Sequence, residues 1–532
     1  MHDAARPLST RRPRPGPKRY ERWIRRPHTP GQAPVAVRGS RAGSGSYPLV
    51  GLWEAGMPQL HDLTALEQGE LIATGKLSPV ELTQHYLERI EQLNETVGAY
   101  VTVTPELALA QAAQAEEDSV EARREGRTLA PLHGVPVPVK DLNFVAGVRA
   151  TLGSRAYAEH VPDVDDHVVT RLRQAGTVML GKTQTPEFGL PCYSENEVAP
   201  PARTPWDLDR SAGGSSGGAA TAVASGLAPL AHGSDGGGSI RIPASVCGLF
   251  GIKPSRGRIS AGPTLHDISG LSTSGPLART VADAAALLDV MAGRMPGDTY
   301  VAPELPAGET FRAHAERDPG TLRVAVLTAA PVPGVEVHAD CVEATRDAAE
   351  LLSGLGHRVD EMALPADDTL ARVFRQVWAV MATQRPVAPE DEEKLIPLTR
   401  HLRGLGQQVS GPEFATALYT FRAVGQLVAQ LMADYDVVLS PTLAKPPALV
   451  GGLRNDADPS AEFDSLAHFT PFTPLFNATG QPAVNLPLHW SAEGLPIGVM
   501  LGGHYGAEAT LISLSAQLEA ARPWAGRKPE VW

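Results

Sequence analysis

A strand–helix–strand series in the second half of the chain limits the fold more than any other feature. The stretch TLRVAVLT at 321–328 is apolar and β-branched, residues 339–353 have helical spacing, and GHRVDEMAL follows at 356–364. This alternation is typical of an α/β protein, in which helices cover a sheet. Further strands are predicted at 436–442 and in the glycine- and proline-punctuated stretch at 482–503. The sequence therefore predicts an α/β fold with a large core.

Cysteine content and charge exclude several classes of protein. The 532 residues carry a net charge of −12 and three cysteines, Cys192, Cys247 and Cys341. Three cysteines are too few for a disulfide framework and lack metal-ligand spacing, so we expect a cytoplasmic protein without a metal site. No run of about 18 apolar residues occurs, which argues against a membrane partner. The acidic balance argues against nucleic acid as a partner.

The first 56 residues differ in composition from the rest. They hold eleven Lys or Arg, three Asp or Glu and eight prolines, without apolar periodicity. We expect residues 1–56 to be a disordered basic extension and residues 57–532 to form the folded domain. The arginine pair at 11–12 suits an export signal, but no apolar region follows it. A solvated tail and translated upstream sequence, with Met57 as the true start, both stay open.

Residues 176–183, GTVMLGKT, match the signature of a phosphate-binding loop. That motif needs a strand before its first glycine and a helix after its lysine. Here residues 167–174 have helical spacing, residues 177–180 are of the types found in a buried strand, and Pro186 would interrupt a helix begun at Lys182. We interpret the match as accidental, a strand that ends in Gly-Lys-Thr.

Two glycine- and serine-rich stretches carry the candidate chemistry: GGSSGG at 213–218 and GSDGGGSIR at 233–241. Glycine leaves backbone N–H groups free to point at an incoming oxygen, and acyl transfer needs a hydroxyl nucleophile near such donors. Gly236, Gly237 and Gly238 supply three donors directly before the Ser239 hydroxyl. The sequence therefore predicts an acyl-enzyme mechanism.

Two other serine arrangements fit less well. GGSSG matches the G-x-S-x-G elbow with Ser215 as nucleophile, but that elbow should follow an apolar strand and here follows the polar WDLDRSA. His232 and Asp235 lie shortly before Ser239, yet groups so close in a tight loop seldom orient as a triad. We expect His232 to be structural.

Longer motifs around these loops resemble a known family. HGVPVPVKD at 133–141, GGSSGG, and GSDGGGSIRIPASVCGLFGIKPSRGR at 233–258 are similar to the amidase signature family of serine hydrolases. The resemblance spans about residues 60–525 and includes FNATGQPAVNLPL near the end. It implies the amidase signature fold, a large twisted mixed β-sheet covered by α-helices on both faces. AHGSDGGGSIRIPASVCG and GRMPGDTYVAP look most similar to the branch of 6-aminohexanoate cyclic dimer hydrolases.

The resemblance also implies a Ser-Ser-Lys catalytic set. Ser239 is then the nucleophile, Ser215 the bridging serine after a cis Gly214–Ser215 bond, and Lys140 the base. The positions implied to assist are the oxyanion hole Gly236, Gly237 and Gly238 and the supporting Ser216, Asp235 and Arg241. Relatives often carry Thr, Ile or Ala where Gly236 stands, so a looser oxyanion hole or a bulkier acyl group is expected here.

Lys140 works as a base only when it is neutral. Lowering a lysine pKa from about 10.4 to near 7 requires roughly 4 to 5 kcal/mol of differential solvation. The apolar approach VPVPV suits burial of Lys140. The alternative is a lysine that is ion-paired with Asp141 at a strand end.

The predicted activity is hydrolysis of a carboxylic amide C–N bond, other than a peptide bond, without a cofactor. Leu190, Cys192 and Tyr193 are candidate substrate contacts, and they favour an amide with an apolar acyl or amine part. Residues 365–430 are predicted to be a mainly helical, variable segment on the substrate side. Two alternatives stay open: the glutaminase subunit of a tRNA-dependent amidotransferase, and a non-catalytic binding protein on the same scaffold. The sequence also leaves a homodimer open.

Overall fold

The computed structural model describes residues 59–365 and 367–532, so the predicted disordered extension lies outside the described residues. The larger of two β-sheets has eight strands in the order β4-β6-β5-β10-β11-β9-β7-β8. These are β4 (Leu230–Asp235), β5 (Phe250–Lys253), β6 (Thr273–Ala278), β7 (Arg323–Val326), β8 (Arg358–Glu361), β9 (Val437–Pro441), β10 (Ala483–Trp490) and β11 (Pro496–Gly503). Neighbours from β4 to β9 pair antiparallel. The β9–β7 and β7–β8 pairs are parallel, so the sheet is mixed.

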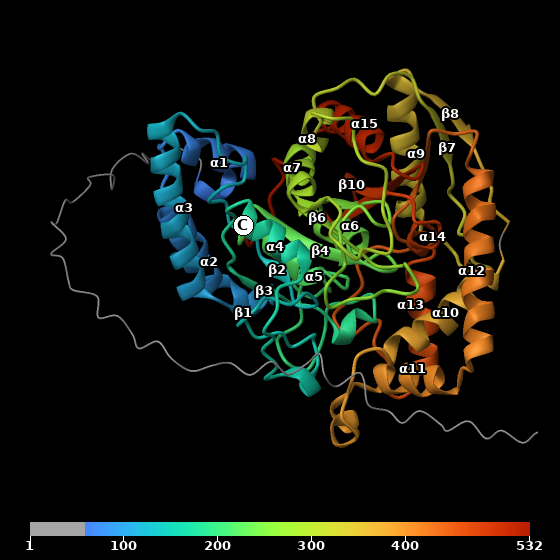
Figure 1. The fold of residues 1–532 in the computed structure, drawn as a ribbon. Coiled ribbons are helices and arrows are strands. Elements are labelled where there is room, and N and C mark those ends of the chain that lie inside the picture. Colours follow the sequence, from blue (N-terminus) through green and yellow to red (C-terminus); the bar gives the residue numbers. More distant parts are fainter. Residues whose placement is uncertain (1–58, 366) are drawn as a thin grey trace, which may run out of the picture. The chain divides into compact units, whose positions relative to one another are not determined.

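Helices cover this sheet on both faces (Figure 1). Val324 and Val326 of β7 pack in one cluster with α7 (Val281–Met291), α9 (Ala339–Gly354) and α15 (Glu508–Ala521). Ala325, which lies between them, packs in a second cluster with α12 (Gly411–Leu431) and α14 (Thr473–Thr479). Successive strand side chains point to opposite faces, so a continuously apolar strand serves two helix layers. The predicted α/β class with a helix-covered mixed sheet is confirmed.

The strand–helix–strand series is confirmed as β7, α9 and β8. The two strands are parallel, with Arg323 opposite Arg358 and Val326 opposite Glu361. Each strand is shorter than the apolar stretch that predicted it, because regular pairing covers only four residues of each. The predicted helical region contains α10 (Thr369–Ala382), α11 (Pro397–Gln408) and α12.

The sequence did not predict the second, three-stranded sheet. Its strands lie in the order β1 (Tyr100–Val103), β3 (Gly181–Thr183) and β2 (Val139–Lys140). The predicted strand that ends in Gly-Lys-Thr is β3, but it is shorter than predicted, because residues 177–180 are not part of it. Val178 joins Pro136 only through an isolated bridge. Prolines have no N–H to donate, so regular pairing begins after them, with Val139 opposite Lys182 and Lys140 opposite Thr183. As predicted, a helix, α4 (His167–Gln174), precedes this segment.

Helices at the start of the described chain follow their sequence signals. Ser78 Oγ accepts hydrogen bonds from the backbone N–H groups of Val80 and Glu81 and so caps the start of α2 (Pro79–Val97). Helix α3 (Pro105–Glu125) ends at Gly126, whose φ of 68° is the left-handed conformation that terminates a helix.

The remaining helices are α1 (Ala65–Ala73), α5 (Gly217–Ala224), α6 (Arg241–Cys247), α8 (Phe311–His314) and α13 (Pro459–Phe469). Single 3-10 turns lie at Leu60–Asp62, Arg155–Tyr157, Glu187–Gly189 and Pro389–Lys394. Each helix within residues 59–365 and 367–532 is too short or too polar to span a bilayer.

Candidate active site

Lys140, at the end of β2, is fully buried, with 0% of its surface exposed. Its Nζ lies 2.7 Å from Ser215 Oγ, 3.0 Å from Ser234 Oγ and 3.2 Å from the Ser234 carbonyl oxygen. Burial lowers the pKa of Lys140 to about 7, against the opposing charge of Asp235. A neutral amine in contact with a serine hydroxyl can accept a proton.

Asp141 does not pair with Lys140, which removes the simplest structural alternative. Its Oδ1 lies 2.8 Å from Lys182 Nζ, and its Oδ2 accepts hydrogen bonds from the backbone N–H (2.9 Å) and hydroxyl (2.5 Å) of Thr151. Lys140 is the last residue of β2 and Asp141 begins the turn after it, and the two side chains have different partners. Lys182, the lysine of the accidental phosphate-loop match, therefore forms an ion pair with Asp141.

The two glycine- and serine-rich loops are joined directly by hydrogen bonds. The Ser216 N–H donates to the Ser239 carbonyl at 3.1 Å. The Ser216 hydroxyl donates to the Ser234 carbonyl at 3.0 Å and accepts from the Ser234 N–H at 3.1 Å. The Gly214–Ser215 bond is cis, as the resemblance implied. Gly214 is required here because a Cβ would lie 2.4 Å from the Tyr193 carbonyl oxygen.

The loop before Ser239 presents only part of the expected oxyanion hole. The backbone N–H groups of Gly236, Gly237 and Ser239 have no hydrogen-bond partner within the described part of the chain. The Gly238 N–H instead donates to Asp235 Oδ1 at 2.8 Å. Gly238 therefore departs from the predicted role, because its donor is already used to shape the loop.

Asp235 and Arg241 form an ion pair that stabilises this loop. Both are fully buried and lie 2.9 Å apart at Arg241 Nη2 and Asp235 Oδ1. Asn477 accepts from Arg241 at 2.7 Å and donates to Asp235 Oδ1 at 2.9 Å. Burial alone would raise the pKa of Asp235, but Arg241 holds it well below its ordinary value. The aspartate therefore stays charged and organises backbone donors.

His232 is placed as a structural residue. Its Nδ1 accepts a hydrogen bond from the Lys140 N–H at 3.3 Å, and its Nε2 lies 3.1 Å from Ser274 Oγ. Burial, with the charges of Lys140 and Lys182, lowers its pKa to about 3. A neutral imidazole thus fixes the backbone that carries Lys140.

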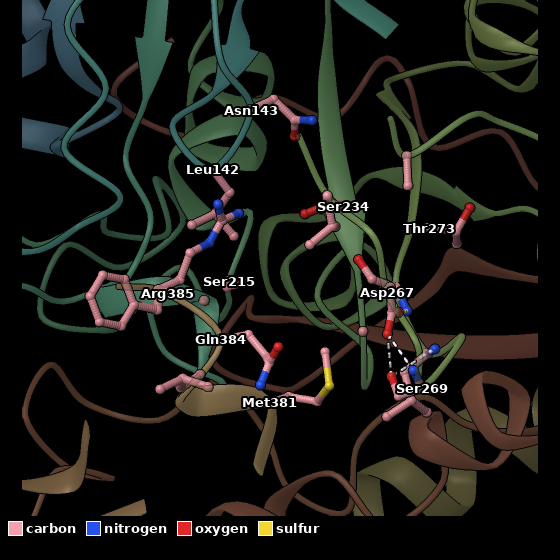
Figure 2. A pocket seen from close by; sticks show the side chains of 18 of the residues that line it. Leu142, Asn143, Ser215, Ser234, Asp267, Ser269, Thr273, Met381, Gln384 and Arg385 are labelled. Carbon is pink, nitrogen blue, oxygen red and sulfur yellow. Dashed lines mark hydrogen bonds between the residues drawn. The ribbon is translucent and has the colours of Figure 1, made fainter. Parts of the chain in front are cut away.

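Two cavities adjoin this centre. The first, called the polar cavity because it is the more polar of the two, contains Ser215, Ser234, Gly236 and the charged Asp166, Asp267 and Arg385 beside apolar side chains such as Leu142, Phe188 and Met381. Ser215, Ser234, Asp267 and Arg385 are labelled in Figure 2. The apolar cavity contains Ser239, Gly237, Cys192, Ile242, Leu370, Phe374, Phe463 and Leu466. Leu190 and Trp378 belong to the walls of both. Ser215 and Ser239 therefore line different cavities.

The three predicted substrate contacts are divided by this arrangement. Leu190 lines both cavities and Cys192 lines the apolar one. Tyr193 lines neither, since it is 1% exposed and its hydroxyl donates to Glu462 Oε1 at 2.6 Å. Its aromatic ring packs into the core beside α10, α11 and α13.

Trp378 fills the space left by Gly236. A Cβ on Gly236 would lie 3.1 Å from the Trp378 ring, and one on Gly237 would lie 3.3 Å from Phe374. The two rings stack, with centroids 5.1 Å apart, and Trp378 Nε1 donates to the Leu190 carbonyl at 3.1 Å. The aromatic side chains of α10 thus occupy the space that a side chain at position 236 would need.

Comparison with known proteins agrees with this geometry. The sequence model of the family described as Amidase matches residues 81–512. The chain belongs to the amidase family. The 6-aminohexanoate-cyclic-dimer hydrolase of Paenarthrobacter ureafaciens is 36% identical over 506 residues, covering 91% of this chain and 97% of that protein.

Solved structures show the same kinship. A 6-aminohexanoate cyclic dimer hydrolase complexed with substrate has a TM-score of 0.82 and 33% identity, covering 88% of this chain and 99% of that one. A bacterial aryl acylamidase of the amidase signature family has a TM-score of 0.78 and 26% identity, covering 88% and 99%. The predicted resemblance is confirmed. This amidase is a hydrolase of carbon–nitrogen bonds other than peptide bonds, and the Ser-Ser-Lys acyl-enzyme mechanism is general to its family.

Several site residues of this amidase were not singled out from the sequence. Ser234 lies in the glycine-rich motif and Asn477 in FNATG, so both were within reach of the resemblance. Phe374 and Trp378 are spaced by four along a helix, which is also the spacing of an ordinary core pair. In the described part of the chain, no group of three or more His, Cys, Asp or Glu side chains is placed to hold a metal ion.

Proposed function

We propose that in this amidase Ser239 is the nucleophile, Ser215 relays its proton, and Lys140 is the base. The observation that carries the proposal is the 2.7 Å contact between the buried Lys140 Nζ and Ser215 Oγ. The pKa of about 7 leaves much of this lysine neutral near neutral pH. The neighbouring carboxylate of Asp141 is ion-paired with Lys182 and does not keep Lys140 charged.

The reaction then has two halves. Ser215 passes the Ser239 proton to Lys140 while Ser239 Oγ bonds to the amide carbon, and the free N–H groups of Gly236, Gly237 and Ser239 receive the oxyanion. The proton returns through Ser215 to the leaving nitrogen as the C–N bond breaks. Water, activated by the same pair, then attacks the acyl ester and releases the carboxylate.

The relay assigns the two cavities to the two parts of the substrate. The leaving nitrogen must reach Ser215, which lines the polar cavity. Ser239 lines the apolar cavity, where Phe374, Phe463 and Leu466 would surround the acyl part. We therefore propose an amide with an apolar acyl group, in keeping with Leu190 and Cys192 as substrate contacts.

Residues 57–532 are proposed as the amidase domain, with 365–430 on the substrate side. Support comes from α10, which contributes to both cavities. Deletion of residues 1–56 should leave kcat/KM unchanged, and a large loss would show that the extension takes part. All three cysteines are free thiols, which supports a cytoplasmic enzyme. A homodimer stays a prediction that light scattering tests.

Two alternatives are separable from this proposal. A glutaminase subunit acts on a small, charged acyl part, which the apolar cavity does not suit, and it would copurify with partner subunits. A non-catalytic binding protein would not react with a serine-directed phosphonate.

The test is a panel of aryl, alkyl, cyclic and primary amides with released amine measured. We expect turnover by the native enzyme, none by Ser239→Ala, and unchanged thermal unfolding of that variant. Ser215→Ala should also lose turnover, because the relay is broken. Equal, retained activity in both variants would contradict the assigned roles.

A further inference from the structure

Arg385 follows α10 and lines the same polar cavity as Ser215 (Figure 2). We propose that Arg385 binds a carboxylate on the amine part of the substrate, so that the preferred substrates are N-acyl amino acids with an apolar acyl group. This inference rests on the proposed function, since it takes the leaving nitrogen to lie beside Ser215. The products would be an apolar carboxylic acid and a free amino acid.

The Arg385 guanidinium has unused hydrogen-bond donors. Within the described part of the chain it makes no ion pair and no hydrogen bond, and its charge interactions are with Asp166 and Tyr157 at longer range. Its Cζ lies 5.8 Å from the centre of the Phe144 ring. A cation–π contact of this kind uses none of the guanidinium N–H donors, so they stay available. Burial lowers the pKa of Arg385, which means that the buried charge lacks full compensation.

The carboxylates of the polar cavity are already engaged by other donors. Asp166 accepts from the Phe144 N–H at 2.9 Å, from Asn143 Nδ2 at 3.0 Å and from the Thr264 hydroxyl. Asp267 accepts from the backbone N–H groups of Ser269, Gly270 and Ser272 at 2.9, 3.1 and 2.7 Å. Within the described residues, neither carboxylate accepts a hydrogen bond from Arg385. The N–H donors of Arg385 are therefore available to an anionic group of the substrate.

Arg375 of the apolar cavity, which lies within α10, provides a contrast. It forms an ion pair with Asp464 and lies over the Phe463 ring, with its Cζ 5.2 Å from the ring centre. Its charge is therefore compensated inside the protein. The arginine of the apolar cavity is thus ion-paired, whereas the Arg385 guanidinium of the polar cavity, on the amine side, is neither ion-paired nor hydrogen-bonded within the described residues.

The experiment compares matched substrates. Hexanoyl amides of glycine, 4-aminobutyrate and 6-aminohexanoate are each set beside the hexanoyl amide of an alkylamine of equal length. The proteins are the native enzyme, Arg385→Gln, Arg385→Lys and the control Arg372→Gln. The side chain of Arg372 is exposed on α10.

We expect the native enzyme to prefer the carboxylate substrate of the best-fitting length. Arg385→Gln should lower kcat/KM for it by about 10- to 100-fold, mainly through KM, because a charge-assisted hydrogen bond is lost. The neutral partner substrate should change little. Arg385→Lys should restore part of the preference, and Arg372→Gln should resemble the native enzyme.

Several outcomes would overturn the inference. A native preference for the neutral amides would do so and still leave the proposed function standing. An equal loss on both substrates in Arg385→Gln would assign Arg385 a structural role. Failure to hydrolyse any amide would instead count against the proposed function.

A second measurement does not depend on any variant folding. Free amino acids and alkylamines of equal length are compared as inhibitors of neutral-amide hydrolysis by the native enzyme. The amino acid should inhibit at the lower concentration, and equal inhibition would contradict a carboxylate site.

Discussion

Two lysines on neighbouring strands of the small sheet, Lys140 and Lys182, show what burial alone does not decide. Both are fully buried, and Lys182 lies opposite Val139, the residue before Lys140. Lys182 meets the Asp141 carboxylate at 2.8 Å, whereas Lys140 meets the hydroxyls of Ser215 and Ser234. A carboxylate partner favours the charged form of a buried lysine, whereas a hydroxyl partner can hydrogen-bond to the neutral amine as well. The chemical nature of the partner therefore distinguishes a structural lysine from a candidate base.

The same comparison explains the phosphate-loop match. Lys182 belongs to GTVMLGKT, yet its ammonium group is turned to an internal aspartate and not to a ligand. By taking Asp141, it leaves Lys140 without an adjacent counter-ion. One lysine therefore indirectly helps to keep the other neutral.

The largest expected effect follows replacement of Lys140. Lys140→Met should lower kcat/KM by about 10²- to 10⁴-fold, because the general base is removed while the apolar surroundings accept the new side chain. Steady-state kinetics on the best substrate of the amide panel measure this. Retention of native activity would remove Lys140 from the mechanism.

Replacement of Lys182 should act on stability. Lys182→Met leaves the buried Asp141 charge unpaired, which should lower the free energy of unfolding by about 3 to 5 kcal/mol. Denaturant unfolding measures the loss. The double variant Lys182→Met with Asp141→Asn should recover part of it, because neither charge then remains. If Lys182→Met unfolds like the native protein, the ion pair does not stabilise the fold.

A third buried lysine gives the smallest expected effect and sharpens the comparison. Burial lowers the pKa of Lys253 to about 7 as well, but its Nζ donates to the Pro254 carbonyl at 2.9 Å and has no hydrogen bond to a serine among the described residues. Lys253→Met should change kcat/KM by less than about fivefold, since no proton relay passes through it. A loss as large as that of Lys140→Met would mean that buried lysines matter to activity for a different, shared reason.

The fold class and the central residues could be predicted because their signals are local. The apolar stretch at 321–328 marks β7, and the glycine-rich motifs at 213–218 and 233–241 carry the serines. The family resemblance supplied Lys140, which lies far from those serines in sequence. Spacing alone would not have joined them.

Other features depend on packing between distant segments. The backbone N–H of Gly238 donates to Asp235 and so does not take its expected role, and Tyr193 lies in the core because its hydroxyl donates to Glu462. Trp378 and Arg385 reach the cavities from α10 and the turn after it, some 140 residues beyond Ser239. Their sequence neighbourhood shows only a helix, so a tertiary structure was needed to find them.

The central claim is tested most directly by the rate at which a fluorophosphonate phosphonylates the enzyme, with loss of fluoride, as pH is varied, with the modified residue identified by mass spectrometry. The base must be neutral to act, and burial places the pKa of Lys140 at about 7. The rate should therefore rise as pH increases through about 7 and then level off, with the adduct on Ser239. An adduct on another residue, or a rate that keeps rising toward the ordinary lysine pKa of about 10.4, would contradict the account.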